Sequence, residues 1–153
     1  MDSHDCNALR QPGSCNDGEF ILAEETLPSQ VPYRAMVTEA VDNLIVPVCL
    51  SATHVGWGTL RLEPVFVHAG EAAGVAAALC RRDGILPRTL GGAALQWELL
   101  RRRIAVTYFA DVDLGGDDAW TREVQYLGAR GFFAGYNADP GRPVSPALAA
   151  AWQ

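Results

Sequence analysis

The chain has 153 residues, a formal net charge of −6 and a pI near 4.9. This is about the length of one domain and is enough to bury a core. The acidic balance argues against a nucleic-acid partner, because binding to a phosphate backbone needs a surplus of lysine and arginine. The cysteines lack C-x-x-C spacing, so neither zinc nor an iron–sulfur cluster is predicted, and a Cys6–Cys15 disulfide is left as an open alternative.

The first thirty residues predict an irregular segment with one strand. They are rich in Asp, Asn, Gly, Ser and Pro, and one short apolar run occurs at 20–23. No apolar run follows Met1, so the sequence shows no signal peptide and leaves the localisation unassigned. The next segment, 31–37, is typical of extended backbone because Pro32 restrains the residue before it.

A short strand and a long helix are predicted in the middle of the chain. The apolar run 43–46 favours a buried strand that ends at Pro47. Pro64 suits the first turn of a helix, where its missing N–H is no loss, and Gly84 suits the end of that helix. Apolar residues cover every face of the segment between them, so we expect a buried helix that is too short for a membrane span. His68 and Glu71, one turn apart, are expected to form an internal hydrogen bond.

The polar segment 49–61 is predicted to be a loop, and any chemistry is expected there. Ser51, Thr53 and His54 place two hydroxyls and one imidazole within four residues, enough to hydrogen-bond a cofactor or a polar substrate. His54 is able to transfer a proton near neutral pH, although a structural loop histidine is the alternative. Glu63 at the helix start complements the helix dipole, while Arg61 either pairs with Glu63 or binds an anionic substrate.

Four motifs together resemble the C-terminal part of the FAD-dependent oxidoreductases that have a glutathione-reductase-like flavin domain. They are D-S-H at the N-terminus, P-Y-R at 32–34, N-L-I-V-P-V-C-L-S-A-T-H at 43–54, and R-L-E-P-V-F followed by A-G-E-A-A-G-V-A-A-A-L. The resemblance runs from residue 2 to about 103. It implies an α/β fold, namely the C-terminal half of an FAD/NAD(P)-binding-type domain, with FAD as cofactor and a small molecule as substrate.

The resemblance also implies a set of site residues. The helix start, at residues 61–65, would lay its backbone against the flavin, where the positive end of the helix dipole stabilises negative charge on the reduced ring. Cys49 stands where related flavoproteins often hold the ribityl chain with an aspartate, which puts that hydrogen bond in doubt. The implied catalytic residues are His54, His4 and Arg34, and the implied cofactor-binding residues are Cys49, Ser51, Thr53, Arg61, Leu62, Glu63 and Pro64. For His4 and Arg34 the alternatives are a surface histidine near the terminus and a salt-bridged surface arginine.

A motif that FAD binding requires is missing from the sequence. No G-x-G-x-x-G loop follows a strand anywhere in the chain, and the glycines at 13 and 18 follow no apolar run. We therefore expect a C-terminal fragment or subunit that needs an N-terminal half or a partner chain, and that is inactive alone. The alternative is a non-catalytic binding or interaction module derived from a flavoprotein.

The last fifty residues predict a separate small helical module. An amphipathic helix over 90–103 leads into it, and further helices are expected from Trp120 to Ala129 and from Pro146, capped by Ser145. The order F-A-D-V, W, L-G-A-R-G-F-F-A-G-Y, P-V-S in 106–150 is similar to a single surface-layer homology repeat, the alternative being a helical cap on the flavin domain. The sequence thus predicts two parts, 1–104 and 105–153. The aspartates at 111–118 lack the glutamate of a calcium-binding EF-hand and are expected to form a solvated loop.

Overall fold

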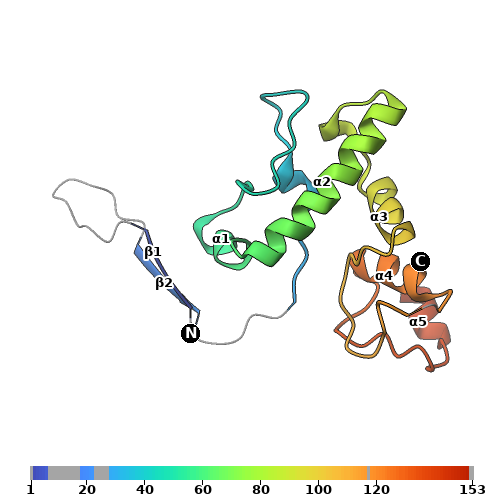
Figure 1. The fold of residues 1–153 in the computed structure, drawn as a ribbon. Helices are drawn as coiled ribbons and strands as arrows, with labels where there is room; N and C mark the ends of the chain where they lie inside the picture. Colours follow the sequence, from blue (N-terminus) through green and yellow to red (C-terminus); the bar gives the residue numbers. More distant parts are fainter. Residues whose placement is uncertain (1, 7–17, 23–27, 117, 152–153) are drawn as a thin grey trace.

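A computed structural model describes residues 2–6, 18–22, 28–116 and 118–151, which are mostly helical (Figure 1). The elements in chain order are strands β1 (Asp2–Cys6) and β2 (Gly18–Leu22), the 3-10 helix η1 (Tyr33–Met36), helices α1 (His54–Leu60) and α2 (Glu63–Asp83), the 3-10 helix η2 (Pro87–Thr89), and helices α3 (Gly92–Arg101), α4 (Thr121–Ala129) and α5 (Pro146–Ala151).

The strands β1 and β2 form an antiparallel hairpin. Their register pairs Asp2 with Leu22 and Cys6 with Gly18, and the hairpin stands to one side of the helices in Figure 1. The sequence predicted a strand near β2 but not β1, because D-S-H-D-C contains none of the β-branched or aromatic residues that favour strands.

The strand predicted at 43–46 is reduced to a single bridge. Ile45 pairs with Val37, and the Val46 N–H donates to the Met36 carbonyl at 2.7 Å. The ladder cannot continue along this segment, since Pro47 has no N–H and the facing chain turns into η1. The partial α/β domain therefore remains a prediction for this chain.

Helix α2 begins and ends where the sequence predicted. Pro64 lies in its first turn, and the Leu62 carbonyl accepts the N–H groups of Val65 and Phe66 at 3.0 and 3.2 Å. At the other end Gly84 adopts a φ of +64°, and the Ile85 N–H closes the helix on the Cys80 carbonyl at 3.0 Å. Within the part of the chain that the structure describes, no helix is long and apolar enough to cross a membrane.

Two hydrophobic clusters pack against one side of α2. The first combines α2 with α3 and the segment before it through Val75, Ala76, Leu79, Cys80, Leu90, Leu95 and Leu99. The second joins Met36 and Leu50 to Ala69, and half-buried Trp57 and Phe66 pack against it.

The other side of α2 is exposed, so the prediction of a helix buried all round is wrong for this chain. Val67 is 71% exposed, and Gly74 is also exposed. The two clusters reach only one side of the helix, and the apolar pattern alone could not reveal this. The internal hydrogen bond predicted for His68 and Glu71 is wrong as well, because Nδ1 and Oε2 lie 3.9 Å apart on exposed side chains.

Helices α3, α4 and α5 confirm the helices predicted for the C-terminal part. Trp97 of α3 stacks on Tyr126 of α4 with ring centroids 4.6 Å apart, and the buried Gln125 side chain accepts the Val106 N–H at 3.1 Å. The Ser145 hydroxyl caps α5 by accepting the Leu148 N–H at 3.1 Å, as predicted.

The aspartates after Phe109 hold loop backbone in place. The Asp111 carboxylate accepts the N–H groups of Ala138 and Asp139 at 2.8 and 2.7 Å, and these bonds lower the pKa of Asp111, the Ala138 bond most. Asp113 accepts the Gly115 N–H at 3.0 Å. Among the residues the structure describes, no three His, Cys, Asp or Glu side chains are grouped so as to hold a metal ion.

Candidate functional site

The S-A-T-H motif begins a helix, so the prediction of a loop throughout 49–61 is wrong. Thr53 is the N-cap of α1, where its hydroxyl oxygen accepts the Gly56 N–H at 3.1 Å. Thr53 is a residue typical of a helix N-cap. Gly56 and Gly58 disfavour a helix, so the sequence as a whole did not predict one here. His54 is therefore the first residue of a short helix; its side chain lies outside the described part of the structure.

The α1–α2 junction is fixed by aromatic packing. Trp57 of α1 and Phe66 of α2 lie with ring centroids 5.8 Å apart, beside the cluster formed by Met36 and Leu50. Trp57 thus has a packing role at this junction. Leu62, Glu63 and Pro64 are exposed at the turn between the helices, while Arg61 is half-buried. A flat ligand can therefore approach the backbone of this turn.

Hydrogen bonds within the junction narrow the set of backbone donors that a ligand could use. We expected residues 61–65 to present N–H groups at the helix start. The Arg61 N–H donates to the Trp57 carbonyl at 3.0 Å, the Val65 N–H donates to the Leu62 carbonyl, and Pro64 has no N–H. The N–H groups of Leu62 and Glu63 are the ones that this arrangement leaves at the exposed turn.

The segment carrying Cys49 and Ser51 runs alongside the turn that carries Arg34. The Ser51 N–H donates to the Ala35 carbonyl at 2.9 Å, and Leu50 between the two candidates is buried against α2. The side chains of Cys49, Ser51 and Arg34 are exposed, and Cys49 is a free thiol. The structure thus brings the turn that carries Arg34 near the polar segment 49–53. This segment leads into α1, which ends at the α1–α2 junction.

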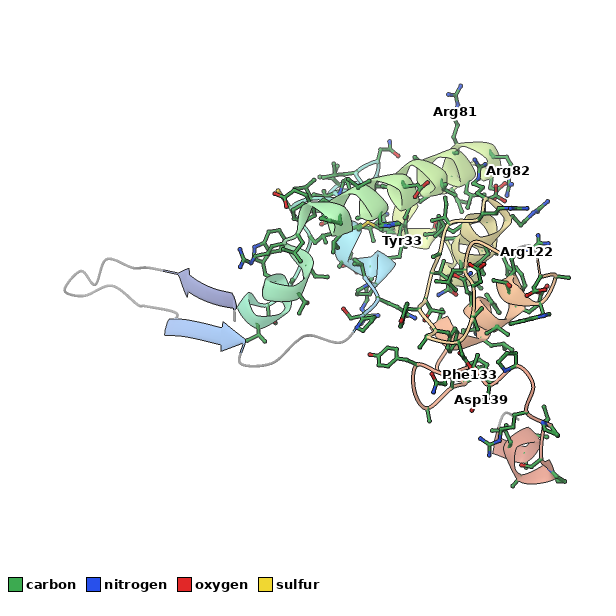
Figure 2. All side chains as sticks on the ribbon, turned by 60° about the horizontal axis from the view of Figure 1, so that its bottom comes forward. Tyr33, Arg81, Arg82, Arg122, Phe133 and Asp139 are labelled. Carbon is green, nitrogen blue, oxygen red and sulfur yellow. The ribbon has the colours of Figure 1, made fainter. Side chains whose placement is uncertain are left out.

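Tyr33, next to Arg34, ties two parts of the fold together. Its hydroxyl donates to the Pro87 carbonyl at 3.0 Å, across 54 positions of sequence, and Figure 2 shows it beside α2. Burial, and secondarily the nearby Cys80 thiol, raise the pKa of Tyr33 to about 12. An ion pair between Arg88 and Asp42 links the same two regions. The P-Y-R motif therefore includes a structural residue that the sequence did not single out.

His4 lies on the hairpin and not on the helices. Its backbone is in β1, paired with Phe20 of β2, and its side chain lies outside the described part of the structure. The hairpin is separate from η1 and from the α1–α2 junction in chain order and in Figure 1. The roles predicted for His4 and His54 remain predictions.

The model of the FAD dependent oxidoreductase family matches residues 1–99, which is about two thirds of the chain and includes every candidate residue above. The chain belongs to this family. No curated protein and no solved structure matches it. The family match stops before the C-terminal part, and the glutathione-reductase-like subfamily and the surface-layer homology repeat remain predictions.

Proposed function

We propose that this chain provides the isoalloxazine-facing half of the flavin site of an FAD-dependent oxidoreductase. The observation that carries the proposal is the family match, which spans the hairpin and the unit from η1 to residue 99 in α3. FAD, when bound, would supply the acceptor for the electrons removed from a small-molecule substrate.

The exposed donors at the α1–α2 junction suit the polar edge of a flavin. The N–H groups of Leu62 and Glu63 would hydrogen-bond the N1–C2=O edge of the ring, and the dipole of α2 would favour negative charge there by about 0.3–2 kcal/mol. The Thr53 oxygen is already an acceptor in the helix cap, so its hydroxyl proton remains for a cofactor oxygen. Ser51 adds a second exposed hydroxyl, on the segment that also carries Cys49.

The charged candidates have opposite effects at this site. Arg34 and half-buried Arg61 would attract an anionic substrate or the electron-rich reduced ring. The Glu63 carboxylate lies at the same helix start and would oppose negative charge on the ring, so we assign its contribution to its backbone N–H. His54, at the start of α1, and His4, on β1, are the residues proposed to exchange protons with the substrate.

The phosphates of FAD would be held outside this chain. The sequence contains no G-x-G-x-x-G loop, and binding the pyrophosphate at a helix N-terminus needs one. We propose that another polypeptide segment supplies it and completes the α/β domain.

The test is to join the chain to a dinucleotide-binding half and measure flavin binding by the yellow absorbance and by fluorescence quenching of FAD. A folded, colourless joined protein contradicts the proposal.

Two variants at position 63 then test the site itself. Glu63→Pro removes one N–H at a position where proline fits a helix start, and we expect it to weaken FAD binding about 3- to 10-fold. The matched control Glu63→Gln keeps that N–H and removes the charge, so FAD binding should be equal to or tighter than in the unmodified chain. Equal binding by the proline and glutamine variants would place the flavin elsewhere.

A further inference from the structure

The single Asp–Pro peptide bond of the sequence lies in an exposed turn of the C-terminal part. Asp139 and Pro140 are exposed, and the Arg142 N–H closes the turn by donating to the Asp139 carbonyl at 2.8 Å. Because proline has no N–H, Asp139 cannot form the cyclic imide that an aspartate otherwise forms with the nitrogen of the next residue. The intramolecular reaction that remains is attack of the carboxylate on the carbonyl carbon of Asp139 itself.

Asp139 has a backbone conformation that is unusual for a residue before proline. Its φ is +49°, in the left-handed region, whereas proline pushes the preceding residue toward extended backbone. The turn makes no demand on the φ of its first residue, so it does not account for this value. The Asp111 carboxylate helps to hold the conformation, since it accepts the N–H groups of Ala138 and Asp139 at 2.8 and 2.7 Å. The Asp139–Pro140 bond therefore follows a strained residue that its neighbours hold in place.

The contacts around Asp139 suit the attack of its carboxylate on its own carbonyl carbon. A side-chain Oδ that bonds to this carbon closes a small cyclic anhydride. The carbonyl oxygen gains negative charge in this step, and the Arg142 N–H that already donates to it would stabilise that charge. The Arg142 guanidinium lies 3.9 Å from Oδ2, and a contact this weak between exposed groups does not fix the carboxylate in place.

We propose that the Asp139–Pro140 bond is a self-cleavage site that releases residues 140–153 in mild acid. The Asp139 carboxylate attacks its own carbonyl carbon, the C–N bond breaks with its electron pair going to the Pro140 nitrogen, and this nitrogen takes a proton from the solvent. Water then adds to the anhydride, which restores the Asp139 side-chain carboxyl group and leaves a new α-carboxyl group at residue 139. The net reaction consumes water and needs no other reactant.

Acid favours this reaction because the departing nitrogen must gain a proton. Hydrogen bonds to the backbone, that of Ala138 most, lower the pKa of Asp111, so its carboxylate stays ionised in mild acid and keeps holding the N–H of Asp139. The strained conformation of Asp139 is therefore retained under the conditions that promote cleavage.

Little in the fold would retain the released segment. Residues 140–150 are exposed apart from half-buried Leu148, and Figure 2 shows α5 set apart from the other helices. Cleavage would remove α5 and leave the family-matched residues 1–99 whole. This activity is independent of the proposed flavin site, which lies at the α1–α2 junction.

The test compares the folded and the unfolded chain at the same pH, because every Asp–Pro bond is somewhat labile in acid. The full chain is incubated at about pH 4 to 5, where carboxyl groups of ordinary acidity are partly ionised, at the lowest value at which circular dichroism shows that helix content is kept. A second sample contains urea. Mass spectrometry follows the fragments 1–139 and 140–153. The folded chain should cleave about tenfold faster, because the strain at Asp139 and the donor from Arg142 exist only in the folded state.

Two variants separate the nucleophile from the conformation. Asp139→Asn keeps the side-chain shape and tolerates left-handed backbone, but it has no carboxylate, so cleavage should be lost. Asp111→Ala removes the acceptor for the N–H groups of Ala138 and Asp139, and should lower the rate of the folded chain toward that of the unfolded chain. Asp113→Ala is the matched control, because the Asp113 carboxylate accepts the Gly115 N–H instead, and its cleavage rate should be unchanged.

Several results overturn the proposal. A folded chain that cleaves no faster than the unfolded chain has only the ordinary acid lability of an Asp–Pro bond. An unchanged rate in Asp139→Asn assigns the reaction to another nucleophile, and an unchanged rate in Asp111→Ala means that the conformation of Asp139 does not promote it. Fragments with other end points assign the cleavage to another bond. None of these results bears on flavin binding by the joined protein.

Discussion

Glycines have opposite surroundings in α2, which lies in the family-matched part, and in α4, which lies in the C-terminal part. In α2, Gly70 and Gly74 face open space, whereas Gly128 of α4 is crowded. A Cβ at position 128 would lie 2.5 Å from Cζ of Phe109 and 2.9 Å from Cγ2 of Thr107. In the C-terminal part, the glycine lets an aromatic ring of the same chain pack tightly. In the family-matched part, Gly70 and Gly74 leave one side of α2 without side-chain bulk and with no neighbour within 4 Å of the Cβ position.

The largest effect that follows from this contrast is at Gly128. Gly128→Ala should destabilise the protein by about 1–3 kcal/mol, because the added methyl group forces the Phe109 ring out of its site. Phe109 is 3% exposed and packs edge-on against Phe133 at 5.0 Å, so the ring cannot move without disturbing its neighbours. Urea denaturation followed by tryptophan fluorescence measures the loss.

A second substitution tests whether the Phe109 ring is the cause. Phe109→Leu removes the ring atoms nearest to Gly128, so the double variant Gly128→Ala/Phe109→Leu should lose less stability than the sum of the single variants. Additive losses would show that Gly128→Ala acts through something other than this contact.

Removing the hydrogen bond from Tyr33 to Pro87, which links η1 to η2, should cost less stability than Gly128→Ala. Tyr33→Phe keeps the half-buried ring and removes the hydroxyl, which leaves the Pro87 carbonyl without this donor. The free energy of unfolding should fall by about 1 kcal/mol. Tyr108→Phe is the matched control, since Tyr108 is 46% exposed and its hydroxyl should matter little. Equal effects of the two variants would contradict the structural role assigned to Tyr33.

At Gly70, on the exposed side of α2, the same type of substitution as at Gly128 should have the opposite sign. Gly70→Ala should stabilise the chain by up to about 1 kcal/mol, because alanine loses less backbone entropy than glycine in a helix and the site has room for a methyl group. The measurement is urea denaturation. A loss of stability would mean that this side of α2 is already packed.

The longer helices were largely predictable from the sequence, whereas the short helix α1 and the strand β1 were not. The ends of α2 followed from Pro64 and Gly84, and the start of α5 followed from Ser145, because each of these residues acts locally. The strand expected at 43–46 depended on a facing chain, and the structure offers Ile45 only Val37. Which side of α2 is buried depended on distant residues too, so its apolar composition could not decide the question.

The location of the candidate site remains a prediction from the motif order, and its local geometry followed from the sequence only in part. The motif order pointed to residues 49–65, and the family match includes all of them. The sequence did not reveal that S-A-T-H begins a helix, nor that Trp57 and Phe66 fix the junction. It also did not show that the Arg61 and Val65 N–H groups are engaged, because hydrogen bonds at a turn follow from its backbone path.

The last expected effect is the pH dependence that comes from Tyr33. Its pKa is raised to about 12, against an ordinary value of 10.0, so the folded state keeps the phenol proton at pH values where the unfolded chain loses it. The stabilisation is therefore fully present below about pH 10 and is lost as the pH rises toward about 12. Urea midpoints between about pH 9 and pH 11 should fall more steeply for the unmodified chain than for Tyr33→Phe, because phenylalanine has no proton to lose. Parallel slopes would show that the phenol ionises alike in both states, and would leave the hydrogen bond to Pro87 as the contribution of Tyr33 to stability.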